Sequence, residues 1–137
     1  LKILNKESGL LGVSGVSSDD RDVCAAEQQG NHRAHLAHEM LYYQIAKTIG
    51  SYYVALGGCD AIVFTAGIGE NQPQLRETVC DYISCLGVEM DKEFNKKAKC
   101  GVTGTLSTPN SKIRVELIAT SEELVIARDT KEIVEAL

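Results

Sequence analysis

Asp19, Asp20 and Arg21 form one of three short stretches whose residue types could do chemistry. A carboxylate can accept hydrogen bonds from ribose hydroxyls, and a planar guanidinium can stack on a purine. The same residues also suit a helix that begins near Arg21, because acidic side chains are favourable at the positive end of the helix dipole. The stretch therefore predicts either a small polar clamp or a solvated helix start.

A glycine-containing turn is the second such stretch, and it follows a short apolar run. Residues 61–66 suit a central strand of a parallel sheet, covered on both faces, because they are mostly apolar and β-branched or aromatic. The two glycines that follow allow a sharp turn and leave room for a ligand. The candidate binding residues are Gly67, Ile68, Gly69, Glu70 and Asn71. A tight connection that needs glycine for its geometry alone is the alternative.

Carboxylates at the start of the last predicted helix form the third stretch. Thr120 and Glu123 predict a capping box, and Glu122 lies between them in the first turn. Such carboxylates complement the helix dipole, but carboxylate oxygens are also ligands that Mg²⁺ prefers. Glu122 is therefore a candidate metal ligand, with Glu123 as the alternative.

Three histidines lie on the longest predicted helix, over residues 32–56. His32, His35 and His38 are spaced i, i+3, i+6, which spreads them around the helix and does not bring them together. The sequence places no obvious cluster of cysteines or carboxylates beside them. We therefore expect exposed or half-buried helix histidines and no metal site.

The periods of apolar residues place these stretches in an α/β order. After an irregular start over 1–22, we expect a short helix over 22–29 and a long buried helix over 32–56. The strand over 61–66 should lead into a helix that Asn71 caps and Gly87 ends. A short helix over 91–98, a strand over 113–118 that is half exposed or near an edge, and the last helix should follow. Two strands do not make a stable parallel sheet alone, so the sheet should be incomplete. The chain also begins at Leu1 without Met, and we expect a piece of a longer protein.

Composition limits the class of protein. The 137 residues carry a formal net charge of −5, which disfavours a nucleic-acid surface. No apolar run approaches the ~20 residues that span a bilayer, and the start does not resemble a signal peptide, so we expect no membrane partner. The five cysteines, Cys100 included, form no CxxC pair, which suits structural thiols in a reduced, cytoplasmic protein.

Four stretches, in this order and at these spacings, together resemble the C-terminal part of the bacterial acetate kinase family. They are residues 4–12 with Ser14 and Gly15, residues 18–21, residues 60–71 with Arg76 and Glu77, and residues 120–129. The resemblance covers essentially all of residues 1–137 and implies the C-terminal nucleotide-binding lobe of such an enzyme. The implied fold is a partial ribonuclease-H-like lobe of the acetate and sugar kinase/Hsc70/actin group, with an incomplete, mostly parallel sheet flanked by helices.

The resemblance also implies a function. The family transfers the γ-phosphoryl group of ATP to acetate with Mg²⁺, giving acetyl phosphate and ADP. By resemblance, Asp19, Asp20 and Arg21 would line the adenosine pocket, residues 67–71 would approach the nucleotide from the other side, and Glu122 would help to hold Mg²⁺. Ser121 stands where the family commonly has Asn. A valine at Gly69 would then abolish ATP binding while folding survives.

The groups that do the chemistry should lie upstream of this chain, since by resemblance the catalytic residues and the acetate pocket belong to the N-terminal part. We therefore expect no catalytic residue and no kinase activity in the chain alone, and we expect a homo-oligomer. A propionate kinase and a non-catalytic nucleotide-binding or interaction module are the alternatives.

Overall fold

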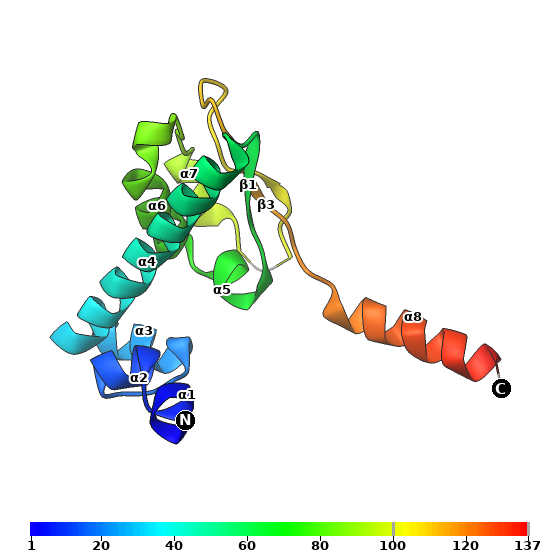
Figure 1. Ribbon diagram of the computed structural model, residues 1–137, viewed down its shortest axis with the longest axis horizontal. Coiled ribbons are helices and arrows are strands. Elements are labelled where there is room, and N and C mark those ends of the chain that lie inside the picture. The colour runs from blue at the N-terminus through cyan, green and yellow to red at the C-terminus, as the bar shows by residue number, and fades with distance from the viewer. Residues whose placement is uncertain (100, 137) are drawn as a thin grey trace.

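The computed structural model describes residues 1–99 and 101–136 (Figure 1). Its elements are α1 (Lys2–Lys6), α2 (Gly9–Ser14), α3 (Asp20–Gln28), α4 (His32–Leu56), β1 (Ala61–Phe64), α5 (Ala66–Asn71), α6 (Pro73–Tyr82), η1 (Ser84–Leu86), α7 (Lys92–Lys97), β2 (Gly104–Thr105), β3 (Arg114–Leu117) and α8 (Glu122–Glu135). The expectation for Cys100 falls outside the described residues. Within the described ranges, none of the helices has the length and apolar character that crossing a bilayer requires.

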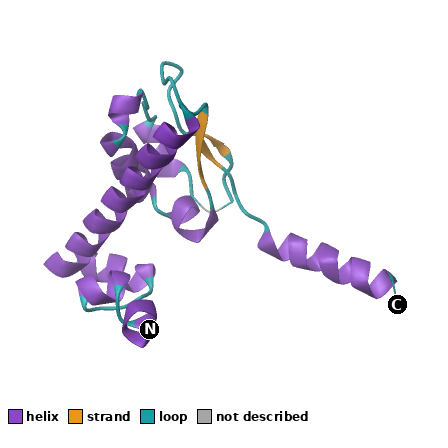
Figure 2. Cartoon of the chain, viewed as in Figure 1, coloured by secondary structure: helices purple, strands orange, loops and turns teal. Residues whose placement is uncertain are grey.

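The sheet is small and mixed, and helices flank it (Figure 2). Its strand order is β1-β3-β2, with β1 parallel and β2 antiparallel to β3. The α/β fold with a partial sheet is confirmed, but two details of the prediction are wrong. β3 is the middle strand, because the short β2 pairs with its second edge. The sequence pattern did not predict β2. β1 lies at the edge of this sheet, and its Val63 is 49% exposed where burial on both faces was expected.

Helix α4 runs from the N-terminal helices to the sheet, with α1–α3 gathered at its N-terminal end and the sheet and α6 beside its C-terminal half (Figure 1). Its predicted range is confirmed, because Asn31 accepts hydrogen bonds from the amides of Arg33 and Ala34 and Gly57 ends the helix in the left-handed conformation. Burial on most sides is wrong. Tyr42 is buried, whereas Met40 and Tyr52 on other faces are exposed.

The first 22 residues contain two short helices and the first residues of α3, where the sequence predicted irregular structure. Helix α2 packs on α3 and α4 through Leu10 and Val13, which contact a buried cluster that includes Val23. The Arg33 side chain of α4 donates hydrogen bonds to the carbonyls of Gly12 and Val13, at 3.1 and 2.8 Å. These tertiary contacts satisfy the end of α2 and outweigh the low helix propensity of its glycines.

The connection after β1 differs from the predicted glycine turn. Ala66, with φ of 58°, makes the left-handed turn, and α5 begins there. Gly67 and Gly69 therefore lie within a short helix, and Asn71 ends it instead of capping the next one. Helix α6 begins at Pro73 in the first turn, as predicted, and buries Leu75, Val79 and Cys80.

Helix α8 extends away from the rest of the chain (Figure 1). The predicted capping box at its start is wrong, because the N-cap is Ser121 and no side chain caps the helix. The Thr120 hydroxyl donates instead to Oε1 of Glu70, at 2.9 Å. The apolar side chains of α8 are uncovered, and Ile126 and Ile133 are 66% and 65% exposed.

Candidate functional site

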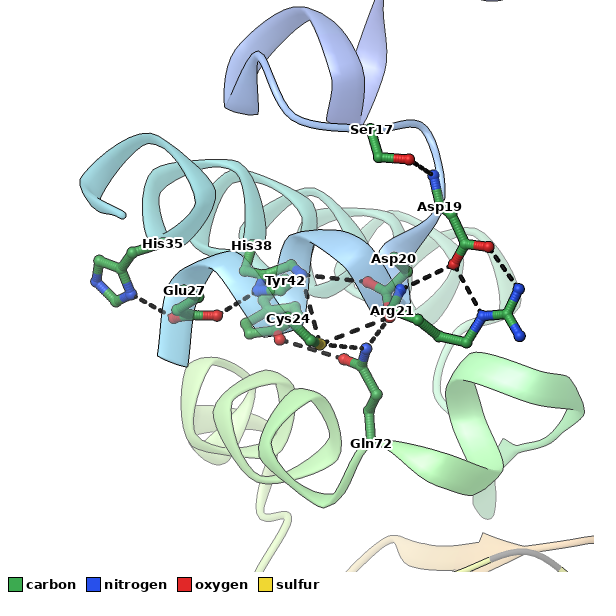
Figure 3. Close-up of polar contacts among 10 residues, drawn as sticks. All are labelled: Ser17, Asp19, Asp20, Arg21, Cys24, Glu27, His35, His38, Tyr42 and Gln72. Carbon is green, nitrogen blue, oxygen red and sulfur yellow. Dashed lines mark hydrogen bonds and ion pairs between the residues drawn. The ribbon is translucent and has the colours of Figure 1, made fainter. Parts of the chain in front are cut away.

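The first turn of α3 holds Arg21 in a fixed position. The Ser17 hydroxyl accepts from the amide of Asp19, and the Asp19 carboxylate accepts from the amide of Arg21 (Figure 3). The guanidinium of Arg21 also donates to both Asp19 oxygens, with Nε 3.0 Å from Oδ1 and Nη2 2.6 Å from Oδ2. These hydrogen bonds lower the pKa of Asp19 to about 2. A bidentate pair of this kind orients the guanidinium plane.

A cavity of about 660 Å³ separates α3 from α5 and the residue that follows it. Its walls are Asp20, Arg21, Cys24, Ala25 and Gln28 on one side and Gly67, Ile68, Asn71 and Gln72 on the other. Two stretches that are far apart in the sequence and that we singled out separately therefore face the same space. The cavity combines apolar surface with carboxylate, amide and guanidinium groups, which is the mixture that small-molecule sites present.

Three of the residues predicted to bind ATP do not line this cavity. Asp19 accepts hydrogen bonds from the guanidinium of Arg21 and so positions that side chain. Gly69 is buried, and a Cβ placed on it would lie 3.4 Å from the backbone carbon of Phe64. Glu70 is buried and accepts from the amide and the hydroxyl of Thr120, each at 2.9 Å. These hydrogen bonds lower its pKa. Gly69 and Glu70 thus connect α5 to the sheet and to the start of α8.

Glu122 faces a second cavity of about 230 Å³. The residues around it are Gly67, Glu70, Thr120, Glu122 and Glu123. The donor set is rich in carboxylate and hydroxyl oxygens, which suits Mg²⁺. Gly67 lines both cavities, so the cavity of the predicted metal ligand adjoins the larger one.

Arg76 is a buried cation that the sequence analysis did not assign a role, and it holds α5 in place. It has no exposed surface, and burial lowers its pKa. Its guanidinium donates to the carbonyls of Gly69 and Glu70 at 2.6 and 3.0 Å, and to the carbonyl of Ala98 at 2.6 Å. Two further bonds go to the side chain and the carbonyl of Asn95. Arg76 therefore connects the C-terminal end of α5 to α7.

A polar network lies between α3 and α4 at the edge of the larger cavity (Figure 3). His38 is 1% exposed, where an exposed or half-buried side chain was expected. Its Nδ1–H donates to Oε2 of Glu27 at 2.5 Å, and its Nε2 lies 3.2 Å from Oδ1 of Asp20 and 4.0 Å from Sγ of Cys24. The Gln72 amide donates to Asp20 and to Cys24. Burial raises the pKa of Cys24 to about 11, with a contribution from the carboxylate of Asp20.

Comparison with known proteins identifies the family. The model of the acetokinase family matches residues 1–128. This chain belongs to the acetokinase family. An acetate kinase of Pseudothermotoga lettingae is 54% identical over 134 residues, and one of Thermotoga maritima is 52% identical over 136.

Solved structures of acetokinase-family proteins have the same fold. The acetate kinase of Porphyromonas gingivalis matches with a TM-score of 0.86 and 45% identity, over 97% of this chain and 33% of that chain. A propionate kinase of Francisella tularensis matches with a TM-score of 0.79 and 36% identity, over 92% and 31%. The acetate kinase of Pseudothermotoga lettingae matches over 98% of this chain and 33% of its own length, so the chain spans about a third of the relatives it matches.

Two residues that position the site, Gln72 and Arg76, could not be assigned a role from the sequence, because their hydrogen-bond partners lie far away along the chain. Gln72 contacts Asp20 and Cys24, and Arg76 contacts Asn95. Cys24 and Asp20 are four residues apart on one helix, so a shared face could have been predicted. His38 lies on the next helix, and its contact with Asp20 and Cys24 depends on how α3 packs on α4, which the local pattern does not show.

Proposed function

We propose that this chain supplies the adenosine-binding wall of the ATP site in an ATP:acetate phosphotransferase, which makes acetyl phosphate and ADP. Residues 1–137 would form the C-terminal nucleotide-binding lobe of that enzyme. The observation that carries the proposal is the cavity of about 660 Å³, which brings Arg21 and Asp20 of α3 to face Gly67, Ile68 and Asn71 of α5. Membership of the acetokinase family and the names of the relatives support the same activity.

Each wall of the cavity has a role in this proposal. The guanidinium of Arg21, held flat by Asp19, offers its free face to a purine ring. Ile68 on the opposite wall supplies apolar contact for the other face of the base. Asn71 and Asp20 supply hydrogen-bonding groups for the base edge and the ribose hydroxyls. Glu70 and Gly69 act indirectly, by fixing α5.

Arg21→Ala tests the base-stacking contact. We expect the affinity for ADP to fall roughly tenfold, because a stacked cation is worth ~1 to 2 kcal/mol when the ligand covers it. Isothermal titration calorimetry of the full-length enzyme measures this. Arg114→Ala, on an exposed side chain of β3, is the matched control and should leave the affinity unchanged. Equal affinities for all three proteins would remove Arg21 from the site.

Mg²⁺ is the second ligand in the proposal, with Glu122 as a group that holds it. The carboxylates and the threonine around the smaller cavity fit a hard cation, and bound Mg²⁺ would neutralise charge on the phosphates of ATP. Glu122→Gln should raise the Mg²⁺ concentration for half-maximal turnover by about tenfold, because the variant loses one ligand charge. Glu123→Gln is the control. A shift with Glu123→Gln alone would transfer the role to Glu123, and no shift with either would contradict a metal site here.

Acetate and acetyl phosphate would bind groups supplied by the rest of the enzyme. We therefore expect the 137-residue chain alone to make no acetyl phosphate, because phosphoryl transfer requires cations and positioning groups around the γ-phosphate. A hydroxamate assay on the purified chain, beside the full-length enzyme, measures this. Formation of acetyl phosphate by the chain alone would contradict it. A cytoplasmic location and a homo-oligomer also belong to the proposal.

Propionate kinase is the second candidate, since a protein of that name shares the fold at 36% identity. Acetate is favoured, because the acetate kinase of Porphyromonas gingivalis matches at 45% identity and the higher TM-score. Comparing kcat/KM for the two acids on the full-length enzyme distinguishes them.

A further inference from the structure

The network between α3 and α4 contains three side chains that commonly bind transition metals. Asp20, Cys24 and His38 each offer one donor atom, and these atoms all lie within 4.8 Å of one another. We propose that they form a binding site for Zn²⁺ or a similar thiophilic divalent cation, separate from the Mg²⁺ site near Glu122. The proposal goes beyond the phosphotransferase activity. It shares Asp20 with the proposed adenosine wall, but its test does not depend on ATP binding.

The spacing of the donors suits tetrahedral coordination. A tetrahedral Zn²⁺ ion, with bonds of ~2.1 Å to nitrogen and oxygen and ~2.3 Å to sulfur, places neighbouring donors about 3.4 to 3.6 Å apart. Here Nε2 of His38 lies 3.2 Å from Oδ1 of Asp20 and 4.0 Å from Sγ of Cys24. Sγ of Cys24 lies 3.8 Å from Oδ2 of Asp20. The two Asp20 distances involve different oxygens of one carboxylate, and with one donor atom from each residue the three lie within 4.8 Å of one another. Rotation of the Asp20 carboxylate together with small side-chain movements would bring them to three corners of the tetrahedron.

The second carboxylate of the network supports the histidine as a ligand. Glu27 accepts from Nδ1–H of His38, which leaves Nε2 facing Asp20 and Cys24, and Nε2 can bind a cation there once it carries no proton. Metal-binding histidines are usually held in this way by a carboxylate on the other ring nitrogen. The ring of Tyr42 stacks on that of His38, with centroids 5.6 Å apart and planes 8° apart, and fixes its orientation (Figure 3).

Charge and access also favour a cation. Within the described residues, the basic side chains at ion-pair distance from Asp20 and Glu27 are His35 and His38, so no lysine or arginine of that part of the chain neutralises the two carboxylates. The sulfur and imidazole ligands select Zn²⁺ over Mg²⁺. Cys24 lines cavities of about 660 and 530 Å³, and either one leads from the surface to the site. Gln72, whose amide donates to Asp20 and Cys24, lines both cavities beside the three donors.

Cobalt titration of the full-length protein tests the site without any nucleotide. We expect one equivalent of Co²⁺ to produce a sulfur-to-cobalt charge-transfer band together with strong visible bands of tetrahedral cobalt, and Zn²⁺ to displace both. Cys24→Ser should abolish the charge-transfer band, and Cys85→Ser, at an exposed cysteine, should retain it. Glu27→Gln should weaken Zn²⁺ binding about 10- to 100-fold. A band that persists in Cys24→Ser, or its absence from the unmodified protein, would overturn the proposal.

A second measurement needs no variant and so does not depend on how Cys24→Ser folds. Zn²⁺ should slow alkylation of Cys24 in the unmodified protein and leave the rate at Cys85 unchanged, as followed by peptide mass mapping. Equal rates at Cys24 with and without Zn²⁺ would count against the site. Nucleotide binding plays no part in either readout, so failure here leaves the proposed ATP site untouched.

Discussion

Arg76→Met should lower the free energy of unfolding by about 3 to 5 kcal/mol, the largest stability effect we expect in this chain. The methionine fills much of the same space but donates no hydrogen bond. The carbonyls of Gly69, Glu70 and Ala98 then lose a charged donor in a buried site. Each buried carbonyl left without a hydrogen bond lowers the stability by ~1 to 3 kcal/mol. Urea denaturation followed by circular dichroism measures the loss.

Two companion variants make the Arg76 result specific. Arg76→Lys keeps the charge but replaces the planar fork by a single ammonium, so it should recover only a small part of the stability. Arg114→Ala removes an exposed arginine and should change stability by less than ~0.5 kcal/mol. A loss below about 1 kcal/mol in Arg76→Met would show that water satisfies the freed carbonyls and that Arg76 does not hold α5.

Gly67→Val is expected to cost more than tenfold in ADP affinity with little change in stability. A Cβ at Gly67 has nothing within 4 Å, so the side chain would project into the space shared by the two cavities and occupy volume that the ligand needs. Valine and glycine differ by only a few tenths of a kcal/mol in helix propensity, so the fold should tolerate the change. Calorimetry with ADP and a thermal melt on the full-length enzyme measure both quantities.

Gly69→Val is the matched comparison, and its expected outcome is the reverse. The sequence suggested that a side chain here would crowd the nucleotide. The structure places the Cβ 3.4 Å from the backbone of Phe64, so the additional methyl groups must displace β1 and cost ~1 to 3 kcal/mol of stability. Equal loss of ADP affinity in both variants, with stability unchanged in both, would show that residue 69 also faces the ligand.

The sequence predicted those helix starts that are determined by hydrogen bonds between residues close together in the chain. The start of α3 at Asp19 and the range of α4 follow from side chains that accept from amides two or three residues away. Asp91 caps the short helix α7 in the same way, because its side chain accepts from the amide of Phe94. These caps depend on nearest neighbours along the chain, so the sequence alone contains the information.

Long-range partners explain what the patterns could not predict. Thr120 fits the pattern of a capping box, but its hydroxyl and its amide donate instead to Glu70, which is fifty residues away along the chain. The sharp turn after β1 was assigned to glycine, yet Ala66 adopts the left-handed conformation. Strained backbone at a residue with a side chain persists only when the surrounding structure supports it, and such support is not visible in a local pattern.

The structure brings five of the eight residues predicted to bind ATP around one cavity. Arg21, Asp20 and residues 67, 68 and 71 do come together around one cavity. Glu70 was grouped with them by its neighbours in sequence, but helix α5 turns successive side chains to different sides, which directs Glu70 to Thr120. Five consecutive residues of a helix point to different sides, so the sequence order does not show which of residues 67–71 line the cavity.

Photoaffinity labelling of the full-length enzyme with 8-azido-ATP tests most directly whether this chain holds the adenosine. The azide reacts from the purine itself, so the position of the label shows where the base lies. We expect label on peptides that contain residues 20–28 or 67–72, with excess ATP suppressing it. ATP-protected label found only elsewhere in the enzyme would contradict the account.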